Sequence, residues 1–119
     1  MNEILVVEDE QKISAFLEKG LRKYGFAPTV VSDGEQAIQA AQAKAYAVIL
    51  LDLALPLKDG WTVLQELRAE GNQCPVIVVT AFGDVCREVL AAGANDYVPK
   101  PFQFKDLLAA VRKQVARGN

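Results

Sequence analysis

Short apolar runs alternate along the chain with segments in which apolar residues recur at helical spacing. The runs predict buried strands, because strands covered on both faces read as nearly continuous apolar stretches. They lie at residues 4–7, 28–31, 47–51, 75–79 and, more briefly, around 97–98.

The intervening segments predict five amphipathic helices with recognisable ends. The first carries Ile13, Phe16, Leu17, Gly20, Leu21 and Tyr24 on one stripe and is followed by Gly25. The second opens with Ser32-Asp33-Gly34-Glu35, which has the form of a capping box led by Ser32, and runs to about Lys44. The third carries Trp61, Leu64 and Leu67 and closes at Gly71; the fourth covers about 84–92, before Gly93; the last carries Phe104, Leu107, Leu108, Val111 and Val115.

Five strand–helix units in succession predict an α/β fold, a doubly wound parallel sheet with helices on both faces. A chain of 119 residues, 51% hydrophobic, has the size of one domain with a real core. We find no repeat, linker or low-complexity stretch inside it.

Charge and composition then exclude several classes of function. Thirteen basic and fifteen acidic residues leave a formal net charge of −2, which argues against bulk electrostatic binding to nucleic acid. The chain contains no histidine, so imidazole metal ligands and histidine general bases are excluded. The longest uncharged run, residues 71–83, is shorter than the roughly 20 residues that a bilayer span needs. Cys74 and Cys86 form no CxxC pair and are interpreted as buried free thiols, so the protein reads as cytoplasmic, without a membrane partner.

Charged and hydroxyl side chains follow the predicted strands where each one ends. Glu8, Asp9 and Glu10 follow the first strand, Asp52 the third, Thr80 the fourth and Lys100 the fifth. In an open parallel sheet the binding crevice lies beyond these carboxyl ends. Taken singly, the acidic residues could cap a helix and Lys100 could be an ordinary surface lysine. Gathered at one edge, however, the carboxylates would repel one another unless they shared a cation, and hard oxygen ligands favour Mg²⁺.

The pocket would then receive a phosphoryl group. Asp52 projects from the middle of the sheet and is the natural nucleophile, while Thr80 is placed to hydrogen-bond a phosphoryl oxygen.

These motifs resemble the receiver domains of two-component response regulators along the whole of residues 4–115. The stretches that carry the resemblance are ILVVEDE (4–10), LLDLALPLKDG (50–60), VIVVTA (76–81) and GANDYVPKPF (93–102). KISAFLEKGLRKYGF (12–26) resembles in particular the OmpR/PhoB-type subfamily, whose output is a winged-helix DNA-binding domain.

The resemblance implies a five-stranded (βα)5 sheet of flavodoxin type, with strand order 2-1-3-4-5. Glu8 and Asp9 match the acidic pair that holds Mg²⁺ together with Asp52, and the backbone carbonyl of Ala54 is expected as a further ligand. Residues with matching roles at the other strand ends are Asp52 as phosphoacceptor, Thr80 and Lys100 as partners of the phosphoryl group, and Tyr97 as the switch aromatic. Lys100-Pro101 matches a peptide bond that is often cis in the family.

The implied function is transfer of a phosphoryl group from a sensor histidine kinase phosphohistidine to Asp52, with Mg²⁺ as cofactor and without turnover of a substrate. Residues 1–119 would form the receiver domain, with an effector domain absent or removed. DNA would be contacted only through that effector, and a homodimer would form through the fourth helix, fifth strand and fifth helix. The alternative is a stand-alone receiver or pseudo-receiver that acts through protein–protein interaction.

Three features depart from the family pattern. Thr80 and Lys100 are 20 residues apart, about two fewer than expected of relatives, and the missing pair falls in the loop or first turn of the fourth helix, which belongs to the output face. Pro99 lacks an N–H and suits an edge strand. Phe82 is bulky beside the expected phosphoryl group, and we hypothesise that it slows hydrolysis by hindering water; alternatively it points to solvent or packs on the fourth helix.

Two other chemistries fit less well. A haloacid dehalogenase-like enzyme also uses an aspartate after a parallel strand, but it needs a second acid where this chain has Ala54. A flavin mononucleotide carrier needs a hydroxyl- and amide-rich phosphate loop, and Glu8, Asp9 and Glu10 would repel a phosphate there.

Overall fold

The computed structural model of the chain describes residues 2–118 and forms one parallel sheet between two helical layers. The strands are β1 (Glu3–Val7), β2 (Ala27–Val31), β3 (Val48–Leu51), β4 (Val76–Thr80) and β5 (Asp96–Pro99). The helices are α1 (Gln11–Lys23), α2 (Gly34–Ala43), α3 (Gly60–Ala69), α4 (Cys86–Ala91) and α5 (Phe104–Gly118). The sheet order is β2-β1-β3-β4-β5 with every neighbouring pair parallel, so the predicted fold and strand order are confirmed.

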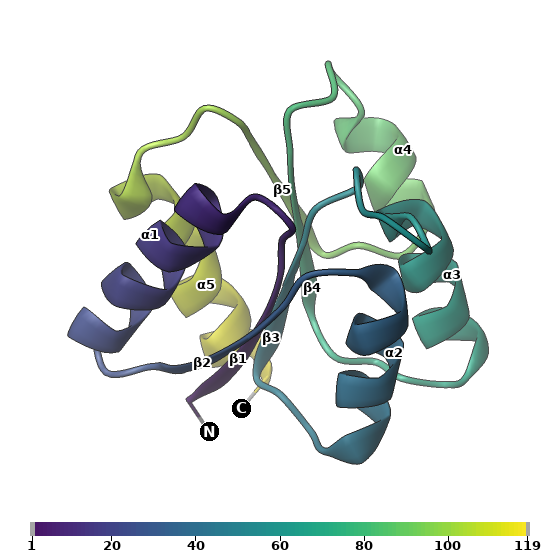
Figure 1. Cartoon of the computed structure of the whole chain (residues 1–119), viewed down its shortest axis with the longest axis horizontal. Helices are drawn as coiled ribbons and strands as arrows, with labels where there is room; N and C mark the ends of the chain where they lie inside the picture. Colours follow the sequence, from purple (N-terminus) through teal and green to yellow (C-terminus); the bar gives the residue numbers. More distant parts are fainter. Residues whose placement is uncertain (1, 119) are drawn as a thin grey trace.

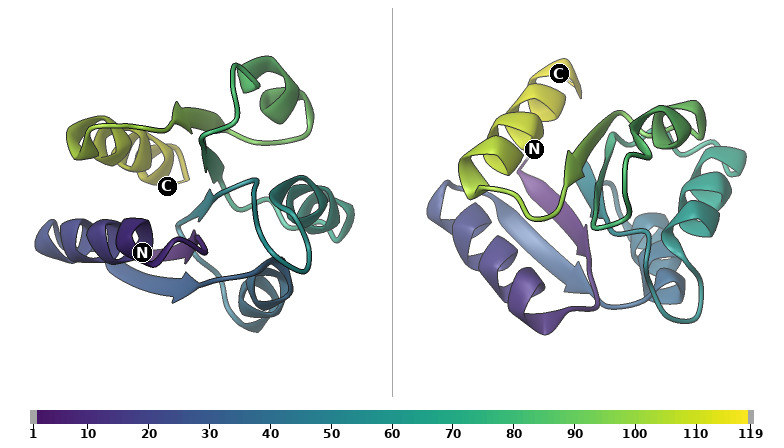
Figure 2. Two further views of the ribbon diagram at one scale, coloured as in Figure 1. Left: turned by 45° about the horizontal axis from the view of Figure 1, so that its top comes forward. Right: turned by 90° about the horizontal axis from the view of Figure 1, so that it is seen from above.

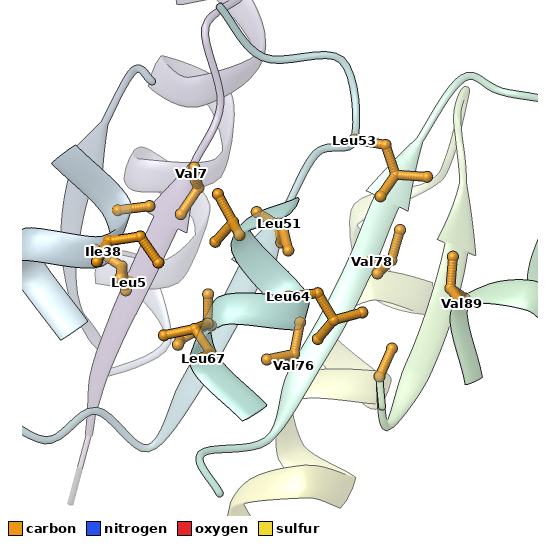
Figure 3. Packing of buried hydrophobic residues seen from close by; sticks show 14 of the residues in the cluster. Leu5, Val7, Ile38, Leu51, Leu53, Leu64, Leu67, Val76, Val78 and Val89 are labelled. Carbon is orange, nitrogen blue, oxygen red and sulfur yellow. The ribbon is translucent and has the colours of Figure 1, made fainter. Parts of the chain in front are cut away.

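Each central strand is buried on both faces because helices cover both. Helices α1 and α5 lie on one face and α2, α3 and α4 on the other (Figure 1 and Figure 2). Alternate side chains of β1 divide between the two cores: Leu5 and Val7 face α2 and α3, whereas Ile4 and Val6 face α1 and α5. Figure 3 shows the first of these cores.

The helices end at the predicted capping residues, with one correction at the start of α2. After α1 the chain turns at Gly25 with φ 90°, and the N–H of Phe26 donates to the carbonyl of Leu21, as expected of a glycine-terminated helix. At the start of α2, however, the cap is Asp33, whose carboxylate accepts the N–H of Gln36 at 2.8 Å. The prediction of Ser32 as the cap was therefore wrong by one residue, because Asp33 caps as well as serine does.

Three further expectations need correction. Helix α4 begins at Cys86, two residues after the predicted start at Asp84. Both cysteines are free as predicted, but they are half-buried rather than buried. Phe16 lies on the predicted apolar stripe of α1, yet its side chain is 52% exposed, although its ring packs beside those of Phe102 and Phe104.

Pro99 is the last residue of the edge strand β5, as predicted, and there its missing N–H removes no hydrogen bond from the interior of the sheet. The bond Lys100-Pro101 is cis, in agreement with the resemblance. In the part of the chain that the structure describes, no helix has the length and apolarity that crossing a bilayer requires.

Candidate functional site

The sheet brings the polar residues that follow β1, β3, β4 and β5 to one edge, at the top of Figure 1. Val7 pairs with Leu51 at the ends of β1 and β3, and the N–H of Asp52 donates to the carbonyl of Val7 at 3.1 Å. On the other side, the N–H of Lys100 donates to the carbonyl of Thr80 at 2.8 Å. Backbone pairing therefore fixes where these side chains begin.

Two carboxylates and one ammonium are buried together at this edge. The side chains of Glu8, Asp52 and Lys100 are each less than a tenth exposed. The ammonium of Lys100 donates to Glu8 Oε1 at 2.7 Å and to Asp52 Oδ2 at 3.3 Å. Glu10 Oε1 lies 3.8 Å from the same ammonium, at the rim. One cation is thus shared among several acids.

The electrostatics of this cluster show in the pKa values of Glu8 and Lys100, both of which are raised. Burial raises the pKa of Glu8 above its ordinary value, although hydrogen bonds from Lys100 and from the N–H of Glu10 oppose the rise. Burial would also lower the pKa of Lys100, but its hydrogen bond to Glu8 and the negative charge of Asp52 outweigh that effect and raise it. Lys100 therefore stays charged, and its single positive charge faces the carboxylates of Glu8, Asp52 and Glu10.

Glu8, Asp9 and Asp52 form a group that suits a metal ion. Each offers a carboxylate oxygen, and these three oxygens lie within 4.8 Å of one another. Asp9 is exposed and leaves the group open to solvent, whereas Glu8 and Asp52 are buried. An all-oxygen donor set with an open side fits Mg²⁺, which prefers carboxylates and keeps several of its waters.

Ala54 and Thr80 complete the surroundings of Asp52. The N–H of Ala54 donates to Asp52 Oδ1 at 3.3 Å, which holds the β3–α3 loop (residues 53–59) against the carboxylate. Thr80 ends the neighbouring strand, is buried, and accepts the N–H of Phe82 on its hydroxyl at 3.3 Å. The carbonyl of Ala54 as a metal ligand stays a prediction.

Tyr97 and Phe82 lie around the β4–α4 loop. The Tyr97 hydroxyl donates to the carbonyl of Gly83 at 3.0 Å, so the aromatic ring is tied to the loop that follows Thr80. The Phe82 side chain is 48% exposed, and its effect on hydrolysis stays a hypothesis.

Two residues that no sequence pattern marks, Lys58 and Gly34, brace the β3–α3 loop. Lys58 pairs with Glu66 of α3 at 2.6 Å and with Glu35 of α2 at 3.3 Å, and Gly34 packs against the Lys58 backbone. No local pattern reveals this contact, because its partners are separated in sequence and meet only when α2 packs beside α3.

Residues 4–112 match the family model described as the response regulator receiver domain, and the chain belongs to that family. It is 46% identical over 117 residues to the transcriptional activator protein IrlR of Burkholderia pseudomallei, covering 97% of this chain and 51% of that protein. It is 45% identical over 114 residues to the transcriptional regulatory protein HprR of Escherichia coli, covering 94% and 51% respectively. The chain thus spans about half the length of these relatives.

Solved receiver domains share the fold. The receiver domain of the Francisella response regulator 1452 superposes with a TM-score of 0.95 at 30% identity, and each chain is covered completely. The receiver domain of the sensor histidine kinase PA1611 from Pseudomonas aeruginosa has a TM-score of 0.88 at 36% identity, covering 97% of this chain and 98% of that one. That structure has a magnesium ion coordinated in its active-site cleft. The present chain is therefore a signalling domain of the receiver class.

Proposed function

We propose that this receiver domain accepts a phosphoryl group on Asp52 from a phosphohistidine of a sensor histidine kinase, with Mg²⁺ bound by Glu8, Asp9, Asp52 and the carbonyl of Ala54. The observation that carries the proposal is the burial of Asp52 at the end of a central strand, beside Lys100 and within one metal-sized group with Glu8 and Asp9.

The placement of each of these side chains supports a role in the transfer. An oxygen of Asp52 attacks phosphorus while the phosphorus–nitrogen bond of the donor breaks, and the leaving imidazole keeps the electron pair of that bond. A carboxylate is already a nucleophile, so no general base is required. The Lys100 ammonium, 3.3 Å from Asp52, balances charge on the phosphoryl oxygens, and Thr80 turns its hydroxyl toward them. When bound, Mg²⁺ supplies further neutralisation of the phosphoryl charge.

The output side of the proposal rests on Thr80 and Tyr97. Thr80 directly precedes the β4–α4 loop (residues 81–85), and the hydroxyl of Tyr97 on β5 donates to Gly83 of that loop. These contacts support a switch in which movement of the Thr80 hydroxyl away from the Phe82 N–H releases Tyr97 from Gly83. The face formed by α4, β5 and α5 would change with it and support a homodimer. In a full-length regulator this face would control a DNA-binding effector domain, and the protein would act in the cytoplasm as a switch rather than as a turnover enzyme.

The experiment is incubation of the chain with acetyl phosphate and Mg²⁺, followed by intact-mass spectrometry. We expect a mass gain of one phosphoryl group that is lost in Asp52→Asn and when the metal is chelated. Asp59→Asn is the matched control, because Asp59 lies on the same loop and caps α3, a task that asparagine performs equally well. Phosphorylation that persists in Asp52→Asn, or that needs no divalent ion, would overturn the proposal.

A further inference from the structure

The β3–α3 loop, which carries Ala54, is pressed against the first residue of α2. A Cβ atom at Gly34 would overlap the carbonyl oxygen of Lys58 and would lie 2.8 Å from its carbonyl carbon. Both atoms belong to the backbone, so they cannot move aside as a flexible side chain would. Glycine at position 34 therefore determines how closely the loop approaches α2.

Lys58 joins the same loop to two helices through its side chain. Its ammonium lies 2.6 Å from Glu66 Oε2 on α3 and 3.3 Å from Glu35 Oε1 on α2. The hydrogen bond to Glu66 raises the pKa of Lys58, with a further contribution from Glu35. Lys58 therefore stays positively charged while it bridges the N-terminal turn of α2 and the second turn of α3.

The rest of the loop contains a strained backbone conformation that tertiary contacts hold in place. Leu57 has φ 68°, in the left-handed region that glycine favours, and its side chain is 83% exposed, so packing does not compensate the strain. At the far end, a Cβ at Gly60 would overlap the carbonyl oxygen of Asp52 and lie 2.6 Å from the Cα of Leu53. Contacts from both sides thus fix the backbone between Asp52 and α3.

We propose that Gly34 and Lys58 are positioning residues for the magnesium site: through them, the N-terminus of α2 sets the loop that presents the Ala54 carbonyl. This inference rests on the proposed function, since it concerns the same site. Neither residue contacts the acidic group directly, and both act through the backbone of residues 53–59.

The energetics separate positioning from simple stabilisation. The carboxylates that pair with Lys58 are partly exposed, 53% at Glu35 and 39% at Glu66, and ion pairs open to solvent contribute little to folding stability. The strained Leu57 lowers stability. A loop that is both strained and weakly paired adds little to the stability of the fold. A fixed carbonyl, however, raises affinity for a metal, because partners that orient ligands commonly change metal affinity by 10–100-fold.

The test is the Mg²⁺ dissociation constant, measured by calorimetry and by the fluorescence of Trp61, the only tryptophan, which follows Gly60 directly. Urea unfolding of each variant establishes that it is folded. In Gly34→Ala we expect Mg²⁺ binding weaker by about tenfold or more. A folded Gly34→Ala protein that binds Mg²⁺ within twofold of the wild type would overturn the inference.

Lys58→Met provides a second test with a distinctive sign. Removing a positive charge near a cation site should tighten Mg²⁺ binding if only long-range electrostatics act. Positioning predicts the opposite, a loss of about two- to fivefold, and unchanged or tighter binding would contradict a role for Lys58. Lys44→Met is the matched control and should bind Mg²⁺ as the wild type does, because Lys44 also pairs with a glutamate, Glu3, but at the opposite end of the sheet.

The outcomes for the inference and for the proposed function can be told apart. Failure of the wild type to bind Mg²⁺ or to be phosphorylated on Asp52 would contradict the proposed function. A wild type that does both, beside variants that bind Mg²⁺ equally well, would contradict only the positioning role of Gly34 and Lys58.

Discussion

Each end of the sheet holds a cationic side chain, but the two cations have different partners. At the carboxyl ends of the strands, Lys100 faces the carboxylates of Glu8 and Asp52, and negative charge is in excess. At the other end, the guanidinium of Arg68 donates only to neutral oxygens: the carbonyls of Gly93, Asn72 and Cys74, and Asn95 Oδ1, at distances of 2.8 to 3.0 Å.

This difference separates a structural cluster from a binding cluster. The guanidinium has five N–H donors, and at Arg68 they are matched by fixed oxygens that join α3 to the loops before β4 and β5. Burial lowers the pKa of Arg68, yet an arginine stays charged. At the other end the carboxylates outnumber the ammonium group of Lys100, so the binding of a further cation there is favourable.

The largest effect should come from Arg68→Ala. The substitution leaves the carbonyls of Gly93 and Cys74 without their donor, and hydrogen bonds to a charged group are worth more than neutral ones. We expect a loss of about 3 kcal/mol in the free energy of unfolding, measured by urea denaturation. Phosphorylation of the folded fraction should be retained, since the cluster lies at the opposite end of the sheet.

Arg22→Ala is the control for this prediction. Arg22 pairs with Glu18 on the exposed surface of α1 at 3.2 Å, so its removal should change the free energy of unfolding by no more than about 0.5 kcal/mol. Similar losses in the two variants would contradict the structural role assigned to Arg68.

The second prediction concerns Cys74, which lies at the same end as Arg68. Burial raises the pKa of its thiol from 9.0 to about 11, and its Sγ donates to the carbonyl of Tyr46 at 3.2 Å. Because the thiolate is the reactive form, alkylation by iodoacetamide at pH 8 should be about 100-fold slower in the folded protein than in urea. Cys86→Ser provides a background in which only Cys74 reacts.

The pH dependence has a defined sign. The folded-state pKa of Cys74 exceeds the unfolded value, so its contribution to stability is present below pH 9 and is lost as the pH rises through about 11. Equal alkylation rates in folded and unfolded protein would show that this end of the sheet is open, and would weaken the contrast with the acidic end.

The same contrast explains which parts of the molecule could be predicted from the sequence. The strands were predictable because apolar runs such as residues 48–51 end abruptly at a polar residue, here Asp52. The meeting of Asp52 with Glu8 and Lys100 followed, since parallel strands place their carboxyl ends at one edge. The roles of these residues came from the family resemblance and remain to be measured.

The structural cluster and the loop brace could not be predicted in this way. The partners of Arg68 are mostly backbone carbonyls, which every residue has, so no residue type marks them. Gly34 could be expected at a helix start, but its contact with Lys58 depends on how α2 packs beside α3. Likewise Ser32 and Asp33 are both favourable N-cap residues, and only the structure shows that Asp33 is the cap.

The smallest expected effect, Asp52→Asn, tests the acidic end most directly. In the absence of divalent ions, asparagine keeps the shape of the side chain and an acceptor for Lys100, while it removes one of three mutually repelling carboxylates. We therefore expect the variant to be more stable than the wild type, by up to about 1 kcal/mol, in urea denaturation with chelator present. Asp33→Asn, at a helix cap where asparagine serves equally, should leave stability nearly unchanged. A less stable Asp52→Asn would mean that Lys100 already balances the acids, and the excess negative charge that distinguishes this end of the sheet from the Arg68 end would not exist.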